Sequence, residues 1–357
     1  MSLGELIDGK YELISIAGEG GMATVFKANV RGAAGFVRPV AVKRIKPEYR
    51  GLKNYIAMFV EEARVGSELA HPNIVQVHDF VIENGLYYLV MEWVEGLDAG
   101  SLLKVYRDAN MLLPWPLAIA IAIGTLRGLG AAHERRSADG TLSPVIHRDV
   151  SPHNILLATS GAVKLSDFGL ARARDRLASL TAPGTVKGKL SYLAPEVTFG
   201  KPNSPQSDMF STAVVIWEAL THERLFDGRT DLDVFKKIRA CSVPALSGYR
   251  TDVPADVEAV LRRGLLADPA LRYPSANDFA FAFASLLAQH SPSDANTELA
   301  AAVNEARMRL AGPNAAGEIT ESFSPFSGSA NVTTSFDIEF SAPDLSMDPV
   351  PLTKLKT

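Results

Sequence analysis

Two short runs hold most of the side chains in this sequence that could do chemistry. Residues 147–154 (His-Arg-Asp-Val-Ser-Pro-His-Asn) contain Asp149, a carboxylate able to accept a proton, and Asn154, whose amide oxygen can bind a hard cation. Residues 167–169 (Asp-Phe-Gly) add a second carboxylate, Asp167. Mg²⁺ in proteins binds a few oxygen ligands together with substrate phosphates, so this combination is typical of phosphoryl transfer.

In this order and spacing, the two runs resemble the signature of the protein kinase family. The resemblance implies that Asp149 orients the acceptor hydroxyl and takes its proton, and that Asn154 and Asp167 hold Mg²⁺. It also implies an α+β class with the bilobal protein-kinase fold. A small β-rich N-lobe is expected at about residues 8–95 and a larger, mainly helical C-lobe at about 96–290. The loop sequences look most like those of bacterial Ser/Thr kinases.

A glycine-rich run at residues 18–21 lies between two β-like runs, 11–16 and 24–29. Backbone N–H groups can approach phosphate oxygens closely where side chains are missing. A Rossmann site would need a helix directly after the glycines, whereas β-branched and aromatic residues at 24–26 favour a strand. Glycine pairs alone would only mark a hairpin turn. The resemblance to kinases, with Ala23 in place of a third glycine, implies an ATP-binding loop. Its expected ATP contacts are Ala17, Gly18, Glu19, Gly20, Gly21, Met22, Ala23, Thr24 and Val25.

Lys43 ends an apolar run at residues 40–43 that predicts the next strand. A lysine at a strand end is usually a solvated edge residue. The resemblance instead makes Lys43 the residue that holds the α- and β-phosphates of ATP and pairs with a helix glutamate. The predicted helix, residues 54–69, offers Glu61 and Glu62. Glu62 lies on the side of the apolar stripe and Glu61 points about 100° away, so Glu62 is the expected partner.

Two further strands are predicted at residues 74–81 and 86–94. The second leads into residues 91–96, which resemble the hinge between kinase lobes, where adenine bonds to the backbone. Asp98 is placed to accept a hydrogen bond from a ribose hydroxyl, or to cap the helix that follows. The expected adenine contacts, with Met91 as the gatekeeper, are Val25, Ala41, Met91, Glu92, Val94 and Leu156.

Charged residues further along the chain fill other roles in the kinase pattern. Ala-Pro-Glu at 194–196 closes an activation segment that begins at Asp167, and Glu196 is expected to pair with Arg272. Asp208 matches the buried family aspartate that holds the backbone of the catalytic loop. Helical periodicity dominates beyond the hinge and predicts helices at 117–135, 208–221, 231–240, 254–266, 276–289 and 294–310.

The activation segment carries two further hypotheses. The resemblance implies that Arg148 binds a phosphate on the segment, and Thr181 and Thr185 lie centrally in it. Ser/Thr kinases usually have a lysine where Ser151 stands and a threonine where Lys189 stands. One interpretation is that Ser151 is a weak substitution and Lys189 is an exposed loop lysine. The other is that Lys189 supplies the missing catalytic cation.

The composition is that of an intracellular catalytic domain, and a cytoplasmic location is expected. The chain has 357 residues, 47% of them hydrophobic, which suffices for two lobes with buried cores. The net charge of −4 favours neither nucleic acid nor an anionic membrane as a partner. A single cysteine, Cys241, excludes an internal disulfide. The apolar stretch at 117–124 is followed by Arg127, which predicts a buried helix and no membrane span.

The composition changes at residues 312–357, where twelve of 46 residues are Ser or Thr and six are acidic against two basic. Such a segment with little periodicity predicts a disordered tail. The alternative is a docking segment around residues 323–326 and 336–340. The predicted organisation is therefore a kinase domain at 8–290, an extra helix at 291–311, and this tail. The extra helix could pack on the kinase domain or on a partner.

The predicted function is a serine/threonine protein kinase that uses ATP and Mg²⁺ and is regulated by autophosphorylation of its activation segment. Its expected partners are protein substrates and a second copy for trans-autophosphorylation. The alternative is a pseudokinase, a nucleotide-binding scaffold whose output is binding. The presence of Lys43, Asp149, Asn154 and Asp167 together favours the enzyme. A small-molecule kinase of similar fold is disfavoured by the complete activation segment.

Overall fold

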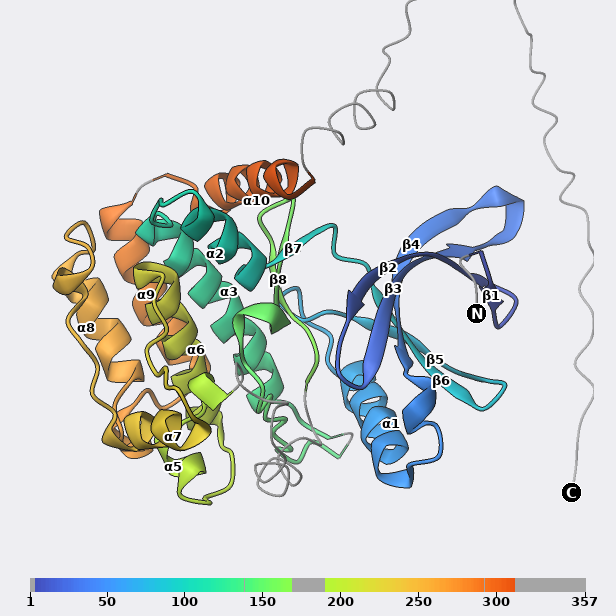
Figure 1. Cartoon of the computed structure of the whole chain (residues 1–357), viewed down its shortest axis with the longest axis horizontal. Helices are drawn as coiled ribbons and strands as arrows, with labels where there is room; N and C mark the ends of the chain where they lie inside the picture. The colour runs from blue at the N-terminus through green and yellow to red at the C-terminus, as the bar shows by residue number, and fades with distance from the viewer. Residues whose placement is uncertain (1–3, 138, 169–189, 292, 312–357) are drawn as a thin grey trace, which may run out of the picture. The chain divides into compact units, whose positions relative to one another are not determined.

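The first part of the chain is rich in strands and the second part in helices (Figure 1). The computed structural model describes residues 4–137, 139–168, 190–291 and 293–311. The first part is an antiparallel sheet whose strands lie in the order β1-β2-β3-β4-β6-β5. Its strands are β1 (Leu6–Ile7), β2 (Tyr11–Glu19), β3 (Ala23–Arg31), β4 (Val37–Ile45), β5 (Val77–Glu83) and β6 (Leu86–Glu92).

Helix α1 (Lys53–Glu68) packs beside this sheet (Figure 1). Phe59 and Ala63, four residues apart on one helical face, are buried in the same apolar cluster as Leu89 and Met91 of β6. The spacing of apolar residues along α1 therefore sets which face of the helix meets the sheet. It also sets the direction in which Glu62, between the two buried residues, points.

The second part of the chain surrounds α3 (Trp115–His133), which packs against α6 and α9. By length and composition, α3 is the one helix in the described residues that could cross a membrane. Because 78% of its apolar stretch is buried inside the fold, the prediction of a buried helix is confirmed. The other helices are α2 (Ala99–Asp108), α5 (Pro195–Thr198), α6 (Pro205–Thr221), α7 (Asp231–Ala240), α8 (Ala255–Gly264), α9 (Ala276–His290) and α10 (Ala295–Ala311).

A three-stranded sheet in the second part departs from the expected run of helices, because its strands are too short to show alternation in the sequence. It joins β7 (Gly96–Asp98), β8 (Ile155–Ala158) and β9 (Val163–Leu165) in antiparallel order. The predicted strand 74–81 also differs, since β5 begins only at Val77. Ile74 bridges to Leu165 instead, and the N–H of Val75 donates to the Leu165 carbonyl at 2.8 Å. These residues therefore extend the small sheet.

Helix α10 packs on the second part of the chain, against α2, α3, β7 and β8. Leu299, Val303 and Ala306 of the expected apolar stripe are buried, whereas Leu310 in the last turn is 52% exposed. The described residues, α10 among them, belong to one compact unit, Met1–Pro313. Of the two packing alternatives for this helix, the structure shows packing on the folded unit.

Candidate active site

Asp208, in the first turn of α6, holds the backbone of residues 147–154. Its Oδ2 accepts from the N–H of His147 at 2.7 Å, and its Oδ1 accepts from the N–H of Arg148 at 2.8 Å. The side chain of Ser204 caps α6, which sets the start of the helix and the position of Asp208. Arg148 has a φ of 67°, and the two hydrogen bonds hold this left-handed conformation. The predicted role of Asp208 is confirmed.

Asn154 ties the end of the catalytic loop to Asp149. Its Nδ2 donates to the Asp149 carbonyl at 2.7 Å and lies 3.2 Å from Asp149 Oδ2. The His147 ring lies 4.7 Å from the Phe168 ring, and its Nε2 is 3.0 Å from the Ser166 carbonyl oxygen. These contacts fix the loop against the segment that leads to the second carboxylate run.

Lys43 joins three elements that are far apart in the sequence. Its Nζ, at the end of β4, lies 2.6 Å from Glu62 Oε1 on α1 and 2.8 Å from Asp167 Oδ1 after β9. Burial by itself would lower the pKa of Lys43, but Asp167 and Glu62 outweigh it and raise the pKa above its usual range. Lys43 therefore stays charged at pH 7. Glu61 binds Arg64 instead, with 2.8 Å between Arg64 Nε and Glu61 Oε2.

A cavity of about 460 Å³ lies between the β2–β3 hairpin and these charged residues. A hydrogen bond of 2.8 Å from the Gly20 N–H to the Ala23 carbonyl closes the hairpin tip. Gly18 pairs with Val25, so the strands extend further into the glycine run than the sequence predicts. The predicted site residues that line the cavity are Gly18, Glu19, Gly20, Gly21, Met22, Ala23, Val25, Lys43, Glu62, Asp149, Asn154 and Asp167.

The expected adenine contacts lie mostly outside the lining of this cavity. Val25, Ala41, Met91, Val94 and Leu156 nevertheless share one apolar cluster, which β3, β4, β6 and β8 bring together. Such a cluster offers the apolar contacts that a purine ring needs. The predicted nucleotide contacts that do not line the cavity are Ala17, Thr24, Ala41, Met91, Glu92, Val94, Asp98 and Leu156.

Asp98 caps α2, which is the second of its two predicted roles. Its Oδ1 accepts from the Ser101 N–H at 3.0 Å and its Oδ2 from the Ser101 hydroxyl at 2.6 Å. His153 Nδ1 also lies 2.9 Å from Asp98 Oδ1. Burial would raise the pKa of Asp98, but the bonds from His153 and Ser101 hold it below its usual range. A contact of Asp98 with ribose stays a prediction.

Some residues line the cavity although the sequence interpretation did not include them. His153 had a usable signal, because it stands beside Asn154 in the catalytic run. Met58 and Phe59 lie one helical turn before Glu62, so helix spacing also points to them. Tyr49 and Tyr55, whose rings are 4.9 Å apart, also line the cavity, and no pattern in the sequence predicts this. The added lining residues are Ile45, Tyr49, Tyr55, Met58, Phe59 and His153.

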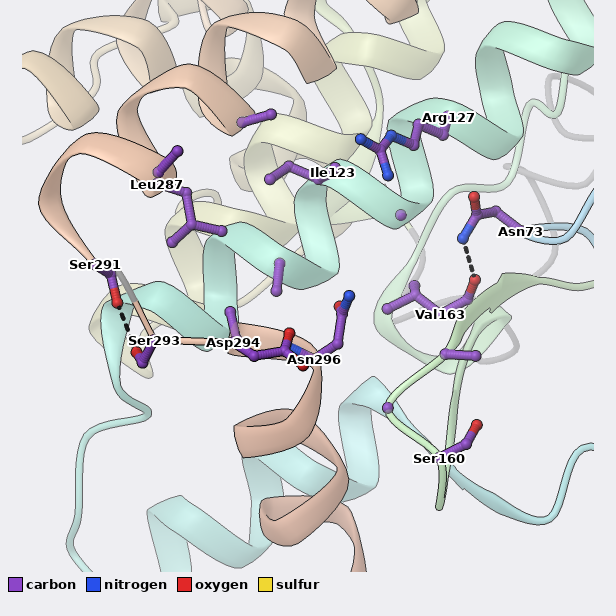
Figure 2. Close-up of a pocket in the computed structure, with 17 residues that line it drawn as sticks. Asn73, Ile123, Arg127, Ser160, Val163, Leu287, Ser291, Ser293, Asp294 and Asn296 are labelled. Atoms are coloured by element: carbon purple, nitrogen blue, oxygen red, sulfur yellow. Dashed lines mark hydrogen bonds between the residues drawn. The ribbon is translucent and has the colours of Figure 1, made fainter.

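A larger cavity, of about 720 Å³, lies between α3, the end of α9, the start of α10 and the β8–β9 turn (Figure 2). None of the predicted site residues lines it. The size of a cavity therefore does not locate the candidate active site in this protein, whereas the convergence of charged groups does.

The donor set fits a magnesium ion. Asn154 Nδ2 is engaged by Asp149, and within the described residues nothing donates to the Asn154 amide oxygen. That oxygen and the Asp167 carboxylate belong to side chains that line the same cavity. No group of three or more His, Cys, Asp or Glu side chains in the described part of the chain could hold a metal. Two protein oxygens suit Mg²⁺, which takes its other ligands from water and phosphates.

A buried ion pair braces the end of the activation segment. Arg272 donates to both carboxylate oxygens of Glu196 at 2.8 Å, as predicted from the family pattern.

Three other predicted residues, Lys189, Thr181 and Thr185, lie outside the described residues. So does the predicted tail.

The strand-rich and helical parts meet where Lys43 lies between two carboxylates, which defines a kinase-type phosphoryl-transfer domain. The chain belongs to the protein kinase family, because a family model described as "Protein kinase domain" matches residues 11–280. The predicted family and fold class are confirmed.

The curated relatives are bacterial kinases. The chain is 39% identical to tyrosine-protein kinase MasK of Myxococcus xanthus, a match covering 79% of this chain and 44% of that protein. It is 33% identical to serine/threonine-protein kinase PrkC of Bacillus subtilis, over 78% and 40% of the two chains. It is 37% identical to serine/threonine-protein kinase PknA of Mycobacterium tuberculosis, over 81% and 64%. The chain thus spans less than two thirds of the length of these relatives.

A solved structure supports the fold independently. The crystal structure of the Mycobacterium tuberculosis PknI kinase domain matches with a TM-score of 0.58 and 26% sequence identity. The match covers 80% of this chain and 98% of that one. This chain therefore has the fold of the PknI kinase domain over nearly the whole length of that domain.

Proposed function

We propose that this chain transfers the γ-phosphoryl group of ATP to Ser or Thr hydroxyls of protein substrates. The observation that carries the proposal is the contact of Lys43 with both Glu62 and Asp167, at 2.6 and 2.8 Å. A permanent cation thereby lies on the wall of a cavity that Asp149 and Asn154 also line. Phosphoryl transfer depends mainly on positioning and on stabilising charge, and these groups supply both.

Each charged residue has a distinct role in the proposed reaction. Lys43 binds the α- and β-phosphates, and Glu62 keeps its ammonium group in position. Asp149 orients the acceptor hydroxyl and accepts its proton as the new oxygen–phosphorus bond forms. Asn154 and Asp167 hold Mg²⁺, which when bound neutralises charge on the phosphates. Backbone N–H groups at the tip of the β2–β3 hairpin would bind the phosphates of ATP.

We further propose that the acceptor hydroxyl belongs to Ser or Thr and not to Tyr. PrkC and PknA are named as serine/threonine kinases and MasK as a tyrosine kinase, so the relatives include both classes. The resemblance of the glycine loop and the catalytic loop to bacterial Ser/Thr kinases favours Ser or Thr. Acid hydrolysis of the labelled product, followed by separation of phosphoamino acids, tests this. Label in phosphotyrosine alone would overturn the Ser/Thr assignment.

The competing function is a pseudokinase that binds nucleotide without transferring phosphate. Incubation of the purified protein with γ-labelled ATP, Mg²⁺ and a generic protein substrate separates the two. Asp149→Asn is the matched control, because it removes the proton acceptor while keeping a side chain of the same size. We expect label transfer that falls by roughly 10²–10⁴-fold in Asp149→Asn with ATP binding retained. A wild-type protein that binds ATP but transfers no label would instead be the pseudokinase.

We also propose that phosphorylation of the activation segment regulates the chain and that it acts in the cytoplasm. A phosphate on Thr181 or Thr185 would bind Arg148 and raise activity, and the phosphate would come from a second copy of the chain. A cytoplasmic place of action is proposed because ATP is supplied there. Protein substrates are the partners that membership of the protein kinase family implies.

A further inference from the structure

Helix α10 is held against the β8–β9 turn and the hinge by contacts at several points along its length. At its start, Gly161 in the β8–β9 turn approaches the first turn of the helix so closely that a Cβ would lie 2.1 Å from the Asn296 carbonyl oxygen. Figure 2 shows Asn296 and Asp294 across the larger cavity from the turn that carries Ser160. Further along, Asn304 Nδ2 donates to the Thr159 carbonyl at 3.1 Å. The position of α10 relative to the turn is therefore narrowly set.

The last part of α10 meets a cluster of charged and aromatic side chains, which we call the Glu95 cluster: Lys27, Trp93, Glu95 and Arg307. Arg307 of α10 binds Glu95 Oε1. Glu95 Oε2 accepts from the Trp93 indole N–H at 2.7 Å and from Lys27 Nζ at 3.3 Å. Lys27 Nζ also lies 4.8 Å from the centre of the Trp93 ring. One carboxylate thus joins β3, the hinge and α10.

The Glu95 cluster lies at the edge of the proposed nucleotide site. Val25 and Lys27 are two residues apart on β3, so their side chains lie on the same face of the sheet. Their partners on β4 are Lys43, which binds the phosphates in the proposed function, and Ala41, an expected adenine contact. Lys27 therefore extends from the face that would cover the nucleotide to the hinge carboxylate of Glu95.

The hinge end of this connection is also held in place. The Glu95 carbonyl accepts from the Thr159 N–H at 2.8 Å, which ties the hinge to the turn on which α10 rests. The hydrogen bond from Trp93, with the cations Lys27 and Arg307, holds the pKa of Glu95 below its usual range. Its carboxylate is therefore charged at neutral pH, and the same helix that fixes the turn also fixes the carboxylate.

We propose that Glu95 is a positioning residue, through which docked α10 holds β3 against the hinge and so raises the affinity for ATP. The proposal rests on the nucleotide site of the proposed function. The cluster is partly exposed, with 35% of the Lys27 side chain, 45% of Glu95 and 37% of Arg307 accessible. Exposed charge pairs contribute little each, so the effect on ATP affinity should be about three- to five-fold rather than all-or-none.

Three variants each replace one charged residue of the Glu95 cluster. Lys27→Met changes β3, Glu95→Gln changes the hinge and Arg307→Ala changes α10. The matched control is Arg309→Ala, because Arg309 lies on the same helix and, among the described residues, forms its ion pair with Glu305 of that helix, at 2.6 Å. The affinity for a fluorescent ATP analogue with Mg²⁺ is measured for the full chain, together with KM for ATP and kcat. Thermal melting monitors folding.

We expect Kd and KM for ATP to rise about three- to five-fold in all three variants, with kcat changed by less than about two-fold and Arg309→Ala like wild type. Combining Glu95→Gln with Arg307→Ala should add little to either change alone, because both break the same contact. Equal nucleotide affinity in Arg307→Ala and Arg309→Ala would overturn the coupling while leaving the proposed function intact. A wild-type protein without measurable affinity for the analogue would overturn both.

Discussion

Replacing Glu196 by alanine should lower the melting temperature of the protein by roughly 6–12 °C. The change leaves the guanidinium of Arg272, whose side chain is 0% exposed, without its carboxylate partner. Breaking a buried ion pair by removing one partner costs about 3–5 kcal/mol, because an uncompensated charge stays in the interior. The free energy of unfolding should therefore fall, although the catalytic groups are untouched.

The surroundings of Arg272 place the cost at the lower end of that range. Arg272 also donates to the carbonyls of Leu266 and Gln206 at 2.8 Å and of Ala267 at 3.1 Å. These three bonds remain in Glu196→Ala and stabilise part of the charge, so about 3 kcal/mol is expected. For a domain of this size, 1 kcal/mol shifts the melting temperature by about 2–4 °C.

Thermal melting followed by circular dichroism measures the effect. The control is Glu305→Ala, which breaks an exposed pair with Arg309 whose side chains are 46% and 58% accessible. Exposed pairs contribute about 0–1 kcal/mol, so the control should melt within about 4 °C of wild type. A Glu196→Ala protein that melts as high as Glu305→Ala would refute the reasoning, because Arg272 would then lose nothing with its partner.

Three further predictions concern activity. Lys43→Met should abolish transfer in a folded protein, and Glu62→Gln should reduce it less, because Lys43 keeps its charge; equal losses in a kinase assay would argue against the role of Glu62. Lys189→Ala should lower kcat by roughly 10²-fold, in the range of losing one charge-stabilising group. Near-normal turnover would leave Lys189 as an exposed loop lysine. Mass spectrometry of the active enzyme should find phosphate on Thr181 or Thr185, and phosphate-free active enzyme would disprove autophosphorylation there.

Residue type and short-range spacing predicted the parts of the site that lie close together along the chain. Asp149 and Asn154 are five residues apart in one loop, so their order already implies that they meet. Helix periodicity distinguished the directions of Glu61 and Glu62, because the face of α1 that packs on the sheet is the face that carries apolar residues. Helical periodicity likewise predicted most helices of the second part.

The sequence by itself thus determined the family, the residues expected to do the chemistry and most elements, because each depends on side-chain type or on a local period. Only the tertiary structure decided which distant residues meet. Glu95 and Arg307 are 212 residues apart, and no spacing rule relates them. The short strands β7, β8 and β9 exist because they pair with one another, not because of their own alternation. The cap that Asp98 forms with Ser101 is a local contact that the sequence suggested, whereas the approach of His153, 55 residues away, to Asp98 depends on the fold.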